Sequence, residues 1–87
     1  MANKNPLIKL YGTSWCGSTR LVKGIFDRKG IKYEWHDIEE DDDAAKFVEK
    51  INGGYRSVPT IVFPDGSVLV EPSDMELMNK IRNFPEH

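Results

Sequence analysis

Residues 7–38, with the sequence LIKLYGTSWCGSTRLVKGIFDRKGIKYEWHDI, decide the fold of this chain. The first part, residues 7–11, is short and mostly apolar, which is typical of a strand buried on both faces. Between residues 17 and 29 the apolar side chains form one stripe of an amphipathic helix, and Gly30 supplies its stop. Apolar and polar residues then alternate over residues 31–38, which predicts a second strand with one wetter face. The stretch therefore predicts a βαβ unit.

A second helix is predicted at residues 44–51, where apolar residues recur at helical spacing. Asp42 or Asp43 is available as its N-cap, and the two glycines at 53–54 supply the stop. The acidic run at residues 39–43 lacks the ligand spacing of a calcium loop, and acids before a helix complement its dipole. We therefore expect this run to be a solvated cap.

A β-hairpin is predicted after the second helix. Residues 58–63 and 67–70 are rich in β-forming side chains, and the tight-turn sequence Pro64-Asp65-Gly66 lies between them. Pro59 cannot donate a hydrogen bond to the ladder, so it belongs at the start of its strand.

The last helix is predicted to begin with a capping box, in which Ser73 is the N-cap and Glu76 closes the reciprocal hydrogen bond. Pro85 is expected to end it. The order βαβαββα predicts an α/β fold with a four-stranded mixed sheet and helices on both faces, which resembles the thioredoxin-like arrangement. We expect residues 1–87 to form a single domain.

Composition excludes several classes of function. The chain has 87 residues, 39% of them hydrophobic and 30% charged, which describes a globular protein. A formal net charge of -2 gives no excess of cations for a nucleic-acid backbone or an acidic lipid surface. No apolar run reaches membrane-spanning length, and the first residues lack the apolar core of a signal peptide. We therefore expect no nucleic-acid or membrane partner and a cytoplasmic location.

Cys16 is the only cysteine, so no internal disulfide can form. A structural zinc site normally needs four ligands, and Cys16 with His36 and His87 does not supply them, so no metal site is predicted. His36 falls on the wetter face of its strand, where we expect a surface or partly packed side chain.

The segment 12–20 joins the first strand to the first helix, at the strand end where open α/β sheets expose functional groups. Cys16 is thereby predicted at or just before a helix N-terminus. The unpaired N–H groups and helix dipole there favour a thiolate, lower the thiol pKa and make the sulfur a nucleophile. The alternative is a buried structural cysteine, but the flanking residues are small and polar.

Short motifs resemble those of the glutaredoxin family over essentially the whole chain: Trp15-Cys16-Gly17, Ser57-Val58-Pro59-Thr60 and Phe63-Pro64-Asp65-Gly66. The glutaredoxin-like group called mycoredoxins is similar at Asn52-Gly53-Gly54, Val58-Pro59-Thr60 and Phe63-Pro64-Asp65-Gly66. The resemblance implies a thiol–disulfide oxidoreductase with a thioredoxin-like fold. It also implies that Pro59 is cis and that the backbone N–H and C=O of Val58 pair with the bound thiol.

The sequence departs from the family's common C-x-x-C motif, because Thr19 stands at the position of the second cysteine. The resemblance then implies monothiol exchange, in which Cys16 attacks a mixed disulfide between a protein and a low-molecular-weight thiol. The co-substrate is expected to be a thiol of the glutathione or mycothiol type, with no bound cofactor. Gly17 and Thr19 are expected to support the thiolate, the latter through its hydroxyl or simply by helix packing.

The expected small-thiol groove needs cations and helix N-termini, because such thiols carry carboxylates. Arg20 and Arg56 are the cations best placed in the sequence, and Ser73 and Asp74 correspond to the place where glutaredoxins hold the γ-glutamyl end. The alternatives are solvated arginines and a simple helix cap. Trp15 is expected to belong to the small-thiol groove, where it shields the site and offers an apolar contact to disulfide-containing partners, or else to pack in its loop. We expect the protein to be a monomer.

Three other functions remain open. The segment Cys16-Gly17-Ser18-Thr19-Arg20 resembles the C-G-T-S-R segment of glutaredoxin-like arsenate reductases, which are longer and use further arginines. Iron–sulfur cluster carriage is known from monothiol glutaredoxins, but those typically have Phe-Ser after Cys-Gly. The third alternative is a redox-dead binding module.

Overall fold

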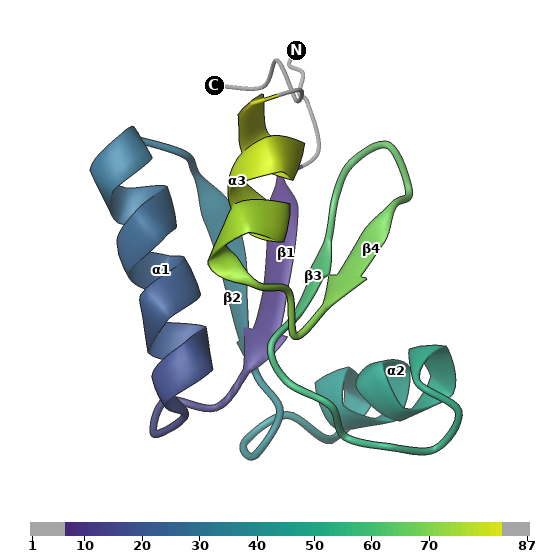
Figure 1. Cartoon of the computed structure of the whole chain (residues 1–87). Coiled ribbons are helices and arrows are strands. Elements are labelled where there is room, and N and C mark those ends of the chain that lie inside the picture. The colour runs from purple at the N-terminus through teal and green to yellow at the C-terminus, as the bar shows by residue number, and fades with distance from the viewer. Residues whose placement is uncertain (1–6, 83–87) are drawn as a thin grey trace, which may run out of the picture.

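The computed structural model describes residues 7–82, and Figure 1 shows their arrangement. The elements follow the predicted order βαβαββα: β1 (Ile8–Gly12), α1 (Gly17–Lys29), β2 (Tyr33–Asp37), α2 (Asp42–Ile51), β3 (Thr60–Val62), β4 (Val68–Val70) and α3 (Asp74–Arg82). The predicted fold is therefore confirmed.

The strands form one mixed sheet in the order β2-β1-β3-β4. β1 pairs with β2 in parallel, whereas the β1–β3 and β3–β4 pairs are antiparallel. In this register Tyr11 faces Thr60, and Thr60 faces Val70. The carboxyl ends of β1 and β4 therefore lie at the same edge of the sheet as the start of β3, and this edge carries the site described below.

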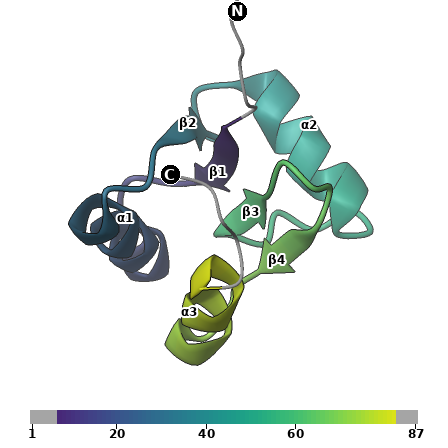
Figure 2. The same cartoon turned by 90° about the horizontal axis from the view of Figure 1, so that it is seen from above.

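Helices cover both faces of the sheet, as predicted. α1 and α3 lie on one face and α2 on the other, which is clearest in the view from above (Figure 2). Two apolar cores follow from this layering. The core under α1 and α3 contains Ile8, Leu10, Val22, Ile25, Phe26, Ile31, Ile61, Phe63, Leu77 and Ile81. The core under α2 contains Tyr11, Ile38, Ala44, Ala45 and Val48.

Several boundaries differ from the predicted ones. Asp41, rather than Asp42 or Asp43, is the N-cap of α2, because its carboxylate accepts hydrogen bonds from the N–H groups of Asp43 and Ala44. β2 begins at Tyr33 instead of residue 31. The N–H of Ile31 donates to Phe26 at the end of α1 (2.9 Å), so the helix cap uses the group that the strand would need.

The hairpin strands are also shorter than predicted, since β3 begins at Thr60 and β4 at Val68. Pro59 lies just before β3, where its missing N–H costs no ladder bond, and its C=O accepts from Glu71 N–H (2.8 Å). The turn between the strands contains Gly66 with φ 92°, a conformation that suits glycine.

The predicted capping box begins α3. Ser73 N–H donates to Glu76 Oε1 (2.8 Å), and Glu76 N–H donates to Ser73 Oγ (3.1 Å). The expected helix end at Pro85 lies outside the described residues. Among residues 7–82 no helix has both the length and the apolar character needed to cross a membrane.

Candidate functional site

Cys16 is the N-cap of α1, with extended backbone angles of φ -77° and ψ 124°. Its N–H donates to Thr13 C=O (3.3 Å), and its C=O accepts from Arg20 N–H (3.0 Å) as the first bond of the helix. The first turn of α1 carries no acidic residue that would oppose a negative charge on the sulfur. The positive end of the helix dipole is thus left to act on the sulfur.

The pKa of the Cys16 thiol is lowered from its ordinary value, and the largest cause is the N–H of Thr19. Partial burial opposes this shift, while the Thr19 hydroxyl and the N–H of Ser18 add to it. The carboxylate of Glu71 lies near enough to raise the pKa slightly. The hydrogen-bond donors prevail, so the structure favours the thiolate, which is the nucleophilic form of cysteine.

Thr19 follows one turn after Cys16, and its side chain is completely buried. Its Oγ1 forms no hydrogen bond within residues 7–82 in the resting geometry. The hydroxyl still lowers the pKa of Cys16, because a donor without another partner beside the sulfur is free to turn its O–H toward a thiolate. Leaving a buried hydroxyl unpaired in the resting state is costly, and such groups call for a functional explanation.

The Val58–Pro59 peptide bond is cis, as the family resemblance implied. Pro59 is buried and comes directly before Thr60, which pairs with Tyr11 in the antiparallel register. It therefore lies opposite the end of β1. Val58 packs against the core under α2. No hydrogen bond within residues 7–82 occupies its backbone N–H or C=O, so both remain available to an extended ligand.

Trp15 projects from the surface with 67% of its area exposed. Its indole N–H donates to Glu39 Oε1 (2.9 Å) in the turn between β2 and α2. This hydrogen bond holds the indole against a neighbouring turn while most of the ring stays exposed. It leaves a large apolar ring beside Cys16 that a partner can cover.

The expected carboxylate-binding residues are only partly brought together. Arg20 is exposed in the first turns of α1, one helical turn from Cys16. Arg56 instead hydrogen-bonds Glu49 of α2, which raises the pKa of its guanidinium. Ser73 and Asp74 begin α3 and are exposed, but the hydroxyl of Ser73 is already used by the capping box.

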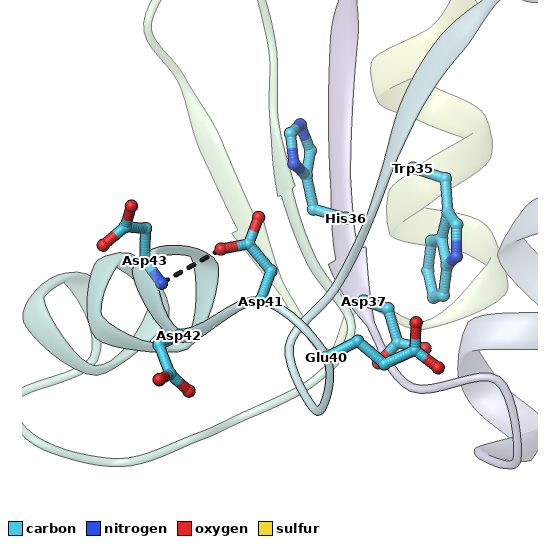
Figure 3. A pocket seen from close by; sticks show the side chains of 7 residues that line it. All are labelled: Trp35, His36, Asp37, Glu40, Asp41, Asp42 and Asp43. Carbon is cyan, nitrogen blue, oxygen red and sulfur yellow. Dashed lines mark hydrogen bonds between the residues drawn. The ribbon is translucent and has the colours of Figure 1, made fainter.

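The acidic run beyond β2 lines an open hollow together with Trp35 and His36 (Figure 3). Asp41 caps α2 from this hollow, so a solvated cap describes the run well. His36 is partly packed as expected, since its ring stacks on Tyr11 with centroids 4.7 Å apart and its Nε2 lies 3.1 Å from Glu34. Within residues 7–82 no three His, Cys, Asp or Glu side chains are grouped to hold a metal ion.

Two residues that influence Cys16 were not among the predicted site residues. The N–H of Ser18 lowers the pKa of Cys16, and it is one of the helix N-terminal N–H groups that the sequence predicted without naming the residue. Glu71 is near enough to raise the pKa of Cys16; its N–H donates to Pro59 C=O, and it adopts φ 48°, in the left-handed region. No local sequence signal predicts that conformation for a glutamate.

The chain is similar to known proteins of one family. The model of the family described as Glutaredoxin matches residues 8–69. A Mycobacterium tuberculosis protein named "putative glutaredoxin" is 43% identical over 74 residues, covering 85% of this chain and 88% of the relative. Mycoredoxin 1 of Corynebacterium glutamicum is 35% identical over 75 residues, covering 85% and 91% respectively. The crystal structure of a glutaredoxin from Archaeoglobus fulgidus has the same fold, with a TM-score of 0.72 at 24% identity, over 90% of this chain and 88% of that one.

Proposed function

The chain belongs to the glutaredoxin family, whose function is thiol–disulfide oxidoreduction, and we propose that it is a monothiol member with Cys16 as its nucleophile. One observation carries the proposal. The sole cysteine of the sequence is the N-cap of α1, where backbone N–H groups and a hydroxyl lower its pKa. A redox-dead module would have no need for such an environment.

The proposed reaction consists of two thiolate displacements. The Cys16 thiolate attacks the small-thiol sulfur of a mixed disulfide with a protein, a new S–S bond forms, and the protein thiolate leaves and takes a proton from water. A second small-thiol anion then attacks the small-thiol sulfur bonded to Cys16. That step releases the small-thiol disulfide and restores the Cys16 thiolate, so the cycle needs no resolving cysteine.

The proposed co-substrate is a low-molecular-weight thiol of the glutathione or mycothiol type, and the relative named mycoredoxin supports the second. Val58 is proposed to pair with its backbone through the unoccupied N–H and C=O beside Pro59. Trp15 is proposed to contact the protein part of the mixed disulfide. The protein is proposed to act as a monomer in a reducing compartment such as the cytoplasm.

Replacement of Cys16 by Ser tests the proposed function. The variant should fold as the wild type does, because the thiol forms no structural bond, and it should lose reduction of a mixed disulfide between a model protein and either small thiol. Serine retains the size of the side chain but is a poor nucleophile at neutral pH. Activity that survives in Cys16→Ser would refute the proposal. A brown protein after anaerobic purification would instead favour iron–sulfur cluster carriage.

A further inference from the structure

Gly12, the last residue of β1, lies directly against Thr19 of α1. A Cβ atom on Gly12 would lie 2.5 Å from Oγ1, 2.8 Å from Cγ2 and 3.2 Å from Cβ of Thr19. Non-bonded carbon atoms normally approach to about 3.5–4.0 Å. Only a residue without a side chain therefore fits at position 12 while Thr19 keeps its place.

Position 12 requires glycine because there is no space for a side chain, and not because of its backbone conformation. Gly12 is absent from the positive-φ glycines of the described chain, so its backbone conformation is open to any residue. It pairs with Asp37 in the parallel register of β1 and β2, and its C=O accepts from Ile38 N–H (3.0 Å). The strand pairing and this hydrogen bond use backbone atoms, so an alanine could form them equally well.

Thr19 has no room to yield. It is completely buried, it is branched at Cβ, and it lies in the first turn of a 13-residue helix. A side chain at Gly12 would therefore force a shift at this contact, and two shifts would reach the thiol. Either the Thr19 hydroxyl rotates away from the Cys16 sulfur, or the first turn of α1 shifts and takes its N–H groups with it.

We propose that Gly12 is a positioning residue for the nucleophile: because Gly12 has no side chain, Thr19 packs directly on the backbone of β1, and that packing keeps the Thr19 hydroxyl and the first turn of α1 beside Cys16. The inference rests on the proposed function, in which Cys16 is the nucleophile. Gly12 itself contacts no reacting atom and acts only through Thr19. It links the end of the sheet to the reactivity of the thiol.

The test compares Gly12→Ala with Gly24→Ala. Gly24 lies within α1, where a Cβ would meet only the flexible end of Arg28 at 3.4 Å. The Cys16 titration is followed by the pH dependence of alkylation and by the ultraviolet absorbance of the thiolate. Gly12→Ala should move the midpoint to higher pH and slow alkylation at neutral pH by roughly threefold or more, since the rate follows the thiolate fraction. Gly24→Ala should leave both measurements unchanged.

A double variant separates positioning from general damage to the fold. Thr19→Ala removes Oγ1 and Cγ2, so it should restore the folding stability of Gly12→Ala and keep the protein testable if the single variant unfolds. It should not restore the thiol titration, because the hydroxyl is gone. In the Gly12→Ala background, Thr19→Ala should therefore raise the midpoint no further.

The proposal is overturned if Gly12→Ala folds and titrates like the wild type. It is equally overturned if the effects of the two substitutions on the midpoint simply add, because Gly12 would then act independently of Thr19. These titrations require no disulfide substrate. A wild type that shows the predicted titrations but reduces no mixed disulfide would refute the proposed function and leave the positioning role intact.

Discussion

Replacement of Thr19 by Val should make the protein more stable and less reactive. Valine keeps the branched shape of threonine, so the close packing of Thr19 on Gly12 is retained while the hydroxyl is removed. That hydroxyl is completely buried and unpaired in the resting structure, yet it lowers the pKa of Cys16. The hydroxyl therefore lowers the stability of the fold but raises the reactivity of Cys16.

The expected sizes follow from ordinary hydrogen-bond energetics. Burying a hydroxyl without a partner costs roughly 1–3 kcal/mol, so the free energy of unfolding should rise by about 1 kcal/mol while Cys16 is protonated. Losing a hydrogen bond to the thiolate removes about 1 kcal/mol of stabilisation, which corresponds to roughly fivefold less thiolate at neutral pH. Alkylation of Cys16 should slow in the same proportion.

The stability gain should itself depend on pH. Because the pKa of Cys16 is lower in the folded wild type than in the unfolded chain, ionisation adds stability as pH rises from the folded pKa toward 9.0. In the Thr19→Val variant the pKa of Cys16 is lowered less, so ionisation of the thiol adds less stability over this pH range. The advantage of the variant should be greatest at acidic pH and should shrink as Cys16 ionises.

Urea unfolding at acidic and mildly alkaline pH, together with alkylation rates, measures both effects. Thr13→Val is the matched control, because Thr13 also carries a buried hydroxyl without a hydrogen-bond partner but does not contribute to the pKa of Cys16. It should stabilise the protein and leave the alkylation rate unchanged. Equal alkylation rates for Thr19→Val and wild type would refute the role assigned to the hydroxyl.

Three further predictions concern the missing second cysteine, the Arg56 guanidinium expected to bind the small thiol, and the hairpin turn. Thr19→Cys should form a disulfide with Cys16 and speed reduction of two-cysteine protein disulfides; rates that match the wild type at every small-thiol concentration would count against monothiol exchange. Arg56→Ala should raise KM for the small-thiol adduct more than it lowers kcat, whereas Glu49→Gln, which frees the guanidinium, should lower KM; unchanged constants in both would make Arg56 a solvated side chain. Hydrogen bonds from Ser67 lower the pKa of Asp65 from 3.8 to about 2, so wild-type stability should fall as pH drops through this range, and Asp65→Asn should flatten that fall in urea unfolding midpoints.

Much of the fold was predictable because its signals are local. Helical spacing in residues 17–29, alternation in residues 31–38 and the capping box at Ser73 each depend on neighbours within a few positions. The place of Cys16 at a helix N-terminus follows from the same local pattern. The errors are local too: the choice between Asp41 and the acids after it depends on one backbone turn, which composition does not specify.

The order of the elements, the mixed sheet, the single thiol and the absence of a second cysteine from its motif all follow from the residue pattern alone. Three contacts could be known only from the folded chain: Arg56 binds Glu49, Glu71 lies near enough to Cys16 to raise its pKa, and Thr19 packs on Gly12. These contacts join separate elements, or depend on how a loop brings the ends of two elements together. Their geometry is set by the packing of whole layers against the sheet, where a few tenths of an ångström decide whether a side chain fits. The residue pattern of a single segment therefore cannot predict these contacts.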